Sequence, residues 1–372
     1  MTVGQERPNR LGRLIDHHCH GLVTADLDRS GFEALMNEAP HPSPLGTSLF
    51  DSMLGLAIRR HCAPVLELEP LVPADAYLAQ RREIGAPEAN RRLLGAAGIS
   101  TFLVDTGLDG PDDSALTTPA ELAGLADGDA YEVVRLERLV EELLREGADD
   151  VPEAVVGRLA GSGAIAAKSI AAYRVGLDLP ASKPSNDELV TALADVDPAR
   201  VVDRTVSGWL AHTALESGLP LQFHTGYGDP DLDLHSADPL HLTPFLRATQ
   251  YLGVPVLLLH TYPFQRHAAY LAQVFDHAFI DLGLAVHNTG ALSTGLIRET
   301  LELAPFGKLL FSTDAYGLAE LYLLGALLFR RGLDQVLDQL LAAGELGEDD
   351  ADRLAALVAH DNAARIYGLG AG

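Results

Sequence analysis

The chain has 372 residues, of which 47% are hydrophobic and 21% are charged, a composition that supplies a large core and excludes a disordered protein. Its 52 acidic and 27 basic residues give a formal net charge of −25, which repels phosphate backbones and anionic membrane surfaces. We therefore expect neither a nucleic-acid partner nor a membrane-bound protein.

The sequence carries no membrane or disulfide signature. No apolar run reaches the roughly 20 residues that span a bilayer, and the N-terminal segment has no apolar signal-peptide core. These features predict a cytoplasmic protein. Cys19 and Cys62 are its two cysteines, too few for a disulfide framework or a cysteine zinc site. Any metal must therefore be held by His, Asp or Lys.

Short apolar runs alternate with longer amphipathic stretches along the chain, a pattern typical of βα units around a parallel sheet. Eight such runs are expected to be strands, at 13–20, 100–107, 131–137, 164–170, 220–226, 255–261, 278–284 and 308–314. The amphipathic stretches expected to be helices include 137–147, 200–217, 265–276 and 292–303. The fold class predicted is α/β, a (β/α)₈ TIM barrel.

One long interruption follows the first strand. Residues 21–99 contain helix-like pieces and are predicted to be a helical insertion in a single domain that spans 1–372. The insertion starts at the end of a strand where barrel active sites lie, so it could be a lid or a dimerisation element. Residues 317–366 are predicted to be closing helices, and a homo-oligomer is left open.

Histidines and an aspartate at strand ends are the candidate metal ligands. Asp16, His18 and His20 alternate along the first strand, which places them on one face and His17 on the other. A lone pair of strand histidines is more often structural than ligating. The prediction is strengthened because three further residues end the fifth, sixth and eighth strands, namely His224, His260 and Asp314. Imidazoles and one carboxylate suit a zinc-like divalent ion.

Lys168 lies inside the apolar fourth strand, where an unpaired lysine is costly. It could be carbamylated and bridge a second metal ion, or it could pair with a carboxylate or an anionic substrate. Beyond that strand, Arg174 could bind a substrate carboxylate, and Tyr227 and Asp229 lie on the loop after the fifth strand. The loop sequence GYGDP at 226–230 is also good turn chemistry without any role in binding.

Taken together, these motifs resemble those of a known family. D-x-H-x-H at 16–20, the single histidines at 224 and 260, Asp314 and the closing NAARIYGL resemble the amidohydrolase superfamily, in its amidohydrolase-2 branch. More narrowly, LIDHHCHGL, AAKSIAAYRVGL, LQFHTGYGDPDLDL, DPLHLTPFL and LLFSTDAYG resemble the amidohydrolase-like half of nodulin-type glutamine synthetase fusion proteins.

The resemblance implies roles for several residues. His18, His20, His224 and Asp314 would hold the metal, and Asp314 would also be the base that deprotonates water. His260 would either ligate the metal or orient the substrate. Binuclear members use a fourth-strand lysine, here Lys168, whereas members of the amidohydrolase-2 branch generally hold one ion. One or two divalent ions, zinc before manganese or iron, are therefore expected.

The function predicted is a metal-dependent hydrolase that cleaves a small amide, cyclic amide or lactone with metal-activated water. A carboxylate-bearing small-molecule substrate is expected from Arg174 and the fused relatives. A metal-dependent decarboxylase of the same branch is the first alternative, and a non-catalytic ligand-binding partner of a glutamine synthetase is the second. The sequence contains neither a G-x-x-x-x-G-K-[ST] phosphate loop nor a G-x-S-x-G nucleophile motif.

Overall fold

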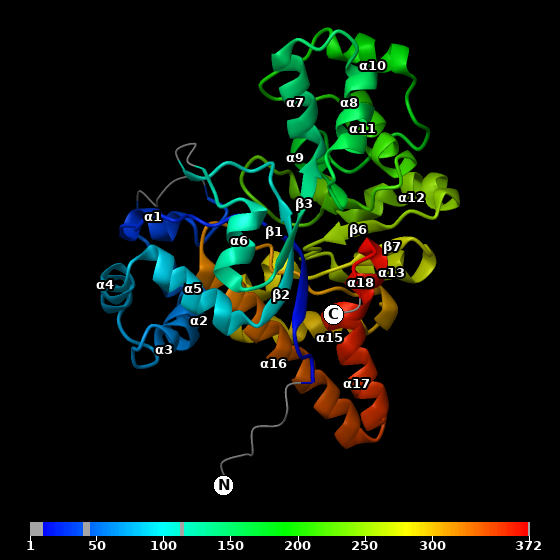
Figure 1. Cartoon of the computed structure of the whole chain (residues 1–372). Helices are drawn as coiled ribbons and strands as arrows, with labels where there is room; N and C mark the ends of the chain where they lie inside the picture. Colours follow the sequence, from blue (N-terminus) through cyan, green and yellow to red (C-terminus); the bar gives the residue numbers. More distant parts are fainter. Residues whose placement is uncertain (1–9, 40–44, 112–114, 371–372) are drawn as a thin grey trace.

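The computed structural model describes residues 10–39, 45–111 and 115–370 (Figure 1). Seven parallel strands form one sheet in which each strand pairs with its neighbours in chain order. They are β1 (Leu14–Cys19), β2 (Ile99–Asp105), β3 (Asp129–Arg135), β4 (Ala166–Ser169), β5 (Leu221–His224), β6 (Val256–Leu259) and β7 (Ala278–Ile280). The first seven predicted strands are therefore confirmed.

The predicted eighth strand is an extended segment that makes only an isolated parallel bridge, between Ile280 and Leu309. It nevertheless closes the barrel, because Leu310 N–H donates to Ile280 O (3.0 Å) and His17 N–H donates to Phe311 O (3.2 Å). The ladder is interrupted at Thr313, whose N–H donates to the Asp16 carboxylate (2.9 Å) instead of to a backbone carbonyl. The prediction of a regular strand is wrong there, whereas the TIM barrel is confirmed.

Helices of the βα units surround the sheet, and α7, α8, α10 and α11 gather at the top of Figure 1. The helices between β2 and the eighth segment are α6 (Pro119–Ala126), α7 (Leu136–Glu146), α8 (Val151–Gly161), α9 (Ala171–Arg174), α10 (Asn186–Leu193), α11 (Arg204–Glu216), α12 (Thr243–Thr249), α13 (Gln265–Val274), α14 (Gly283–Thr289) and α15 (Ser293–Leu301). α11 begins later than the predicted 200–217 because the Asp203 side chain caps the N–H groups of Thr205 and Val206.

Both helical additions to the barrel are present. The insertion contains α1 (Arg29–Ala34), α2 (Met53–Ala57), α3 (Ala63–Val65), α4 (Ala74–Ile84) and α5 (Ala86–Ala97), with a π-helical turn at Ile58–Cys62. The closing helices are α16 (Ala319–Ala343), α17 (Glu348–Ala356) and α18 (Asn362–Tyr367). Among the residues described, no helix combines the length and apolarity that crossing a membrane requires.

The core has two parts. A large cluster lies between strands and helices, and a smaller one joins strand residues to α18. Nearly every strand contributes to the smaller cluster, so it fills the barrel interior; its members include Ile15, Leu103, Val133, Leu257, Phe279 and Leu310. Asn362 in α18 donates to Leu309 O (2.8 Å), at the start of the eighth segment. α18 therefore closes the barrel end where strands begin, which leaves the opposite end open.

The insertion is fixed to the barrel by a buried ion pair. Arg81 in α4 and Glu320 in α16 lie 2.7 Å apart, with side chains 4% and 0% exposed. Tyr77 donates to the same carboxylate oxygen (2.8 Å), and Arg81 also reaches the Asn90 side chain (3.1 Å). Asn90 in turn donates to Val23 O (3.0 Å). α4 and α5 are therefore anchored to α16 and to the chain after β1.

Glu320→Gln should destabilise the protein by about 3–5 kcal/mol, because it leaves the Arg81 guanidinium buried without its counter-ion. Chemical denaturation of the wild type and the variant measures this loss. Glu146→Gln, which removes a 56% exposed partner of Arg158, is the matched control and should cost far less. Equal losses in the two variants would show that the buried pair does not anchor the insertion.

His277 allows a test of how the stability of the fold depends on pH. It lies at the end of the barrel opposite the C-terminal ends of the strands. It precedes β7, and its Nε2 lies 3.3 Å from Thr249 Oγ1. Burial, with a smaller effect from Lys308, lowers the pKa of His277 from 6.5 to about 4. The unfolded chain therefore binds a proton between these pH values that the folded chain does not, so stability falls as the pH falls through this window.

His277→Gln should make the free energy of unfolding less dependent on pH between 6.5 and about 4. Denaturation series across this range, on the wild type and the variant, measure the change in slope. The exposed His241 gives the control, since His241→Gln should leave the slope of the wild type in place. An unchanged slope in His277→Gln would contradict the assignment.

Candidate metal centre

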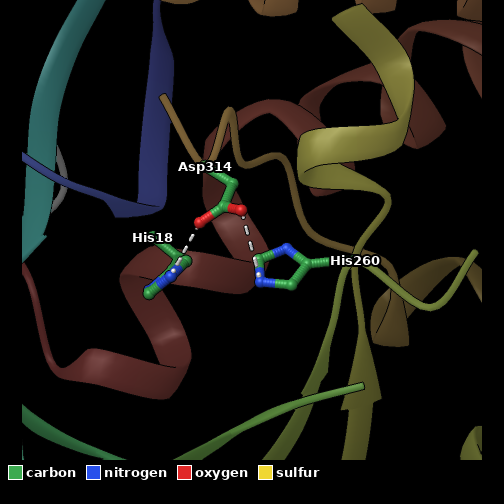
Figure 2. Close-up of side chains that lie close together, drawn as sticks. All are labelled: His18, His260 and Asp314. Carbon is green, nitrogen blue, oxygen red and sulfur yellow. Dashed lines mark ion pairs between the residues drawn. The ribbon is translucent and has the colours of Figure 1, made fainter. Parts of the chain in front are cut away.

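Three histidines converge on one carboxylate at the open end of the barrel, and Figure 2 shows two of them facing it. Asp314 Oδ1 lies 3.0 Å from His18 Nε2 and 3.3 Å from His20 Nε2. Asp314 Oδ2 lies 3.5 Å from His260 Nε2. His18 lies in β1, His20 directly follows it, His260 follows β6 and Asp314 ends the eighth segment. The C-terminal ends of separate strands therefore build the cluster.

The backbone turns sharply where two of these side chains enter the cluster. His260 and Asp314 have φ values of 67° and 52°, in the left-handed region that L-residues rarely adopt. Gly283 leaves room beside them, because a Cβ at that position would lie 3.2 Å from His260 Nδ1 and 2.5 Å from Ser312 Oγ. Strained backbone of this kind is concentrated at functional sites.

Hydrogen bonds fix the ring tautomers of His18 and His20. Gln222 Nε2 donates to His17 O (2.8 Å), which places its Oε1 2.9 Å from His18 Nδ1. His20 Nδ1 lies 3.2 Å from Asp105 O. Because both acceptors are carbonyl oxygens, each Nδ1 carries the proton and each Nε2 presents its lone pair to the cluster.

Charges in the cluster suit metal ligation. Burial lowers the pKa of His18 to about 3, helped by the charge of Lys168, and burial also lowers the pKa of His260. For Asp314, burial by itself would raise the pKa, but interactions with His260, His18 and His20 together hold it well below its ordinary value. At neutral pH His18 and His260 are therefore neutral imidazoles, and Asp314 is an ionised carboxylate.

The donor set fits a divalent metal ion. Within the described residues, neither ring nitrogen of the fully buried His260 has a hydrogen-bond partner, although both need one. His18, His260 and Asp314 offer ligand atoms that all lie within 4.8 Å of one another, and so do His18, His20 and Asp105. Nitrogen and carboxylate ligands without sulfur suit zinc and similar ions.

Lys168 lies directly below this cluster. Its Nζ is 3.1 Å from His18 Nε2 and 3.8 Å from Asp105 Oδ2, and its side chain is 2% exposed. Burial lowers the pKa of Lys168, while Asp105 opposes the shift. Asp105 in turn binds Arg135 through two nitrogens, at 2.7 and 3.1 Å. The structure thus places Lys168 beside a carboxylate, and its bridging role stays a prediction.

His224 lies near the cluster but is not aimed at it. Its Nε2 is 3.2 Å from Tyr227 O, and its ring stacks at a tilt on Tyr173 with centroids 4.5 Å apart. The ring centroid of His260 is 4.9 Å away. His224 belongs to neither of the ligand groups found in the described residues, so its metal-binding role also stays a prediction.

A cavity of about 710 Å³ opens above the cluster. His20, Lys168, His224 and Asp314 contribute to its lining, as do Arg174, Asp229 and residues 34–39 of the insertion. Arg174 Nη2 lies 3.1 Å from Glu141 Oε1. Of the predicted substrate-binding residues, Arg174 and Asp229 therefore face the cavity. Tyr227 is not part of this lining; its ring packs edge-on against Tyr262, with centroids 5.6 Å apart.

Several supporting residues were missed from the sequence. His17 lies 2.8 Å from Asp281, and Asp281 accepts the backbone N–H of His260 (2.8 Å). Gln222 and Tyr367 tie His17 to His18, since Tyr367 OH is 3.0 Å from His17 Nδ1 and 2.9 Å from Gln222 Nε2. Adjacency to the His-x-His motif could have singled out His17, but nothing in the sequence pairs these residues across the barrel.

Comparisons with known proteins agree with this geometry. The amidohydrolase family model matches residues 209–369, which include His224, His260 and Asp314. Protein fluG of Emericella nidulans is 32% identical over 220 residues, which cover 54% of this chain and 25% of that protein. The chain therefore spans about a quarter of the length of this curated relative. The resemblance to amidohydrolases is confirmed.

Solved structures extend the likeness to nearly the whole chain. A Lactobacillus casei protein described as a metal-dependent hydrolase is 27% identical, with a TM-score of 0.81 over 96% of this chain and 95% of that one. The two chains therefore share one fold over nearly their whole lengths. A uronate isomerase of Bacillus halodurans shares the fold at 15% identity, with a TM-score of 0.63 over 97% of this chain and 94% of that one.

Gln222→Met should weaken zinc binding by about 10- to 100-fold, because it removes the oxygen that accepts the His18 Nδ1 proton. Competition with a chelator of known affinity measures the change. Tyr367→Phe removes a contact one step further from His18 and should have a smaller effect. Thermal unfolding checks that both variants fold. Wild-type affinity in a folded Gln222→Met protein would contradict this positioning role.

Proposed function

We propose that the protein is a metal-dependent hydrolase that cleaves a small amide, cyclic amide or lactone bearing a carboxylate. The observation that carries the proposal is the cluster of His18, His20 and His260 around Asp314 at the floor of the cavity. Zinc is the ion best suited to three imidazoles and a carboxylate. When bound, such an ion polarises a carbonyl and lowers the pKa of water to about 7.

Asp314 is assigned as the general base. Its side chain is 11% exposed, more than those of the histidines around it, and it lines the cavity. Its lowered pKa keeps the carboxylate ionised at neutral pH, so it can accept a proton from water that attacks a carbonyl carbon. The proton then passes to the leaving nitrogen or oxygen as the bond breaks.

His18 and His20 are assigned as ligands through Nε2, because hydrogen bonds already occupy their Nδ1 atoms. His260 also ligates through Nε2, the nitrogen nearer to Asp314. His224 and Lys168 line the same cavity. His224 is assigned as a further ligand of the metal, and Lys168, when carbamylated, as the bridge to a second ion. The metal count therefore determines the role of Lys168.

Arg174 supports the choice of a carboxylate-bearing substrate. It lines the cavity from the short helix α9, directly after β4. Arginine matches a carboxylate with two parallel N–H donors. The basic side chains Arg135, Arg138 and Arg200 line the same cavity in a chain whose formal charge is −25. These three arginines are paired with Asp105, Asp109 and Asp231, so the proposal of a carboxylate-bearing substrate depends on Arg174.

The metal content of the purified protein tests the proposal. We expect one or two divalent ions per chain, and the double variant His18→Ala/His20→Ala should lose them. Asp314→Asn should lower hydrolysis of a responsive amide or lactone by at least about 100-fold, because it removes the base. Elemental analysis and assays of ammonia or acid release provide the readouts.

The control His267→Ala/His360→Ala removes two partly exposed histidines that pair with acids elsewhere, so it should keep the metal. Absence of any ion from the wild type, even after reconstitution with zinc or manganese, would refute the metal-dependent mechanism. Release of CO₂ in place of ammonia or acid would identify a decarboxylase and refute hydrolysis. If the wild type holds two ions per chain and Lys168→Ala holds one, Lys168 is a bridging residue.

A further inference from the structure

We propose that the cavity binds a free α-amino acid head group on its substrate, with the carboxylate on Arg174 and the ammonium between Glu38 and Asp229. This inference rests on the proposed function and narrows its substrate class. Glu38 comes from the insertion after α1, Asp229 from the loop after β5 and Arg174 from α9. All three line the cavity above Asp314.

Glu38, on the acidic side of this site, has other carboxylates as its charged neighbours. The charges that act on Glu38 come from two other carboxylates, Asp314 and Asp229, and none comes from a basic group among the described residues. Burial and this repulsion raise the pKa of Glu38 to about 7. Burial also raises the pKa of Asp229, although its Oδ1 accepts the N–H of Asp231 (2.8 Å). An ammonium group placed between the two carboxylates would relieve both costs.

The basic side retains unused hydrogen-bond donors. The side chain of Arg174 is 10% exposed, and Glu141 is the carboxylate it contacts, through Nη2. Arg174 Nε is buried and has no hydrogen-bond partner within the described ranges. The neighbouring arginines are more fully engaged: Arg135 binds Asp105 through two nitrogens, and Arg138 contacts both Asp109 and Glu142. Arg200, which is 45% exposed, contacts Asp231 and the Tyr173 carbonyl. Arg174 is therefore the buried arginine of the cavity best able to take a substrate carboxylate.

Both sides of the site line one cavity, and electrostatic interactions connect them. The charges of Arg200 and Arg174 act on Asp229 and lower its pKa against the effect of burial. A carboxylate and an ammonium on one carbon require a base and an acid that line one cavity, as Arg174 and Asp229 do. A lone amine would leave Arg174 Nε without a hydrogen-bond acceptor, and a second carboxylate would be repelled by Glu38 and Asp229.

The head group leaves the reacting bond free to reach the metal centre. A cavity of about 710 Å³ exceeds what an α-amino acid fills, so a side-chain amide can extend toward Asp314. The substrate class inferred is thus an amino acid whose side chain carries the amide or lactone carbonyl. The residues that would bind the head group are then different from the metal ligands and Asp314, which would carry out hydrolysis.

Head-group binding can be measured without any reaction. The probes are L-norvaline, which has the full head group and no bond to hydrolyse, N-acetyl-L-norvaline, which has no ammonium, and 1-aminobutane, which has no carboxylate. Calorimetry on the metal-loaded full chain should show that L-norvaline binds at least about tenfold more tightly than either analogue, since each lost charged contact is worth about that factor.

Variants test the residues assigned. Glu38→Gln/Asp229→Asn should abolish the preference for L-norvaline over N-acetyl-L-norvaline. Arg174→Lys should reduce the preference for L-norvaline over 1-aminobutane, because lysine cannot bind a carboxylate through two parallel donors. Arg174→Lys keeps a cation beside Glu141, so the fold is retained. Glu146→Gln removes an acid that is 56% exposed and should leave both preferences in place. A purely structural role would not change selectivity between probes.

Equal binding of L-norvaline and either analogue to the wild type would overturn the inference, as would no binding of L-norvaline. If metal-dependent hydrolysis is observed in that case, the proposed function stands and only the head-group assignment fails. Selective L-norvaline binding by a protein that hydrolyses no amide or lactone would instead support the head group and refute the proposed function.

Discussion

The architecture of the site depends on closure of the barrel between its first strand and its last segment. Asp314 N–H donates to His18 O at 3.0 Å, so the carboxylate and the His-x-His pair are held together although almost 300 residues separate them. Asp16 reinforces this seam by binding Thr313 through its side chain. The last segment therefore lacks a regular ladder of backbone hydrogen bonds. Asp314 has a positive φ, and its side chain points into the cluster.

A second network positions the same cluster from inside the barrel. Gln222, His17, Asp281 and Tyr367 connect α18 at the closed end to His18 and to the backbone of His260 near the open end. The same helix fills the barrel interior with apolar side chains. Packing at the closed end and ligand orientation at the open end are thus coupled through hydrogen bonds.

The sequence predicted the strands and the converging residues because each strand is a short apolar run that ends in a polar side chain. It could not predict Asp105, Gln222 or Asp281 as supports, since their partners lie on other strands and only closure brings them together. Nor could it tell that Tyr227 would pack on Tyr262 or that His224 would turn to a loop carbonyl, because loop conformation decides both. Glu38 was missed for the same reason, since the insertion carries it to the cavity.

The central claim is that His18, His20, His260 and Asp314 hold a divalent ion. Anomalous diffraction from crystals of the zinc-loaded protein, recorded on both sides of the zinc absorption edge, tests it most directly. The account predicts an anomalous peak bounded by these four side chains, with a second peak beside Lys168 only if two ions bind. A zinc-loaded crystal with no peak at the four side chains, or with its peak at surface carboxylates alone, would contradict it.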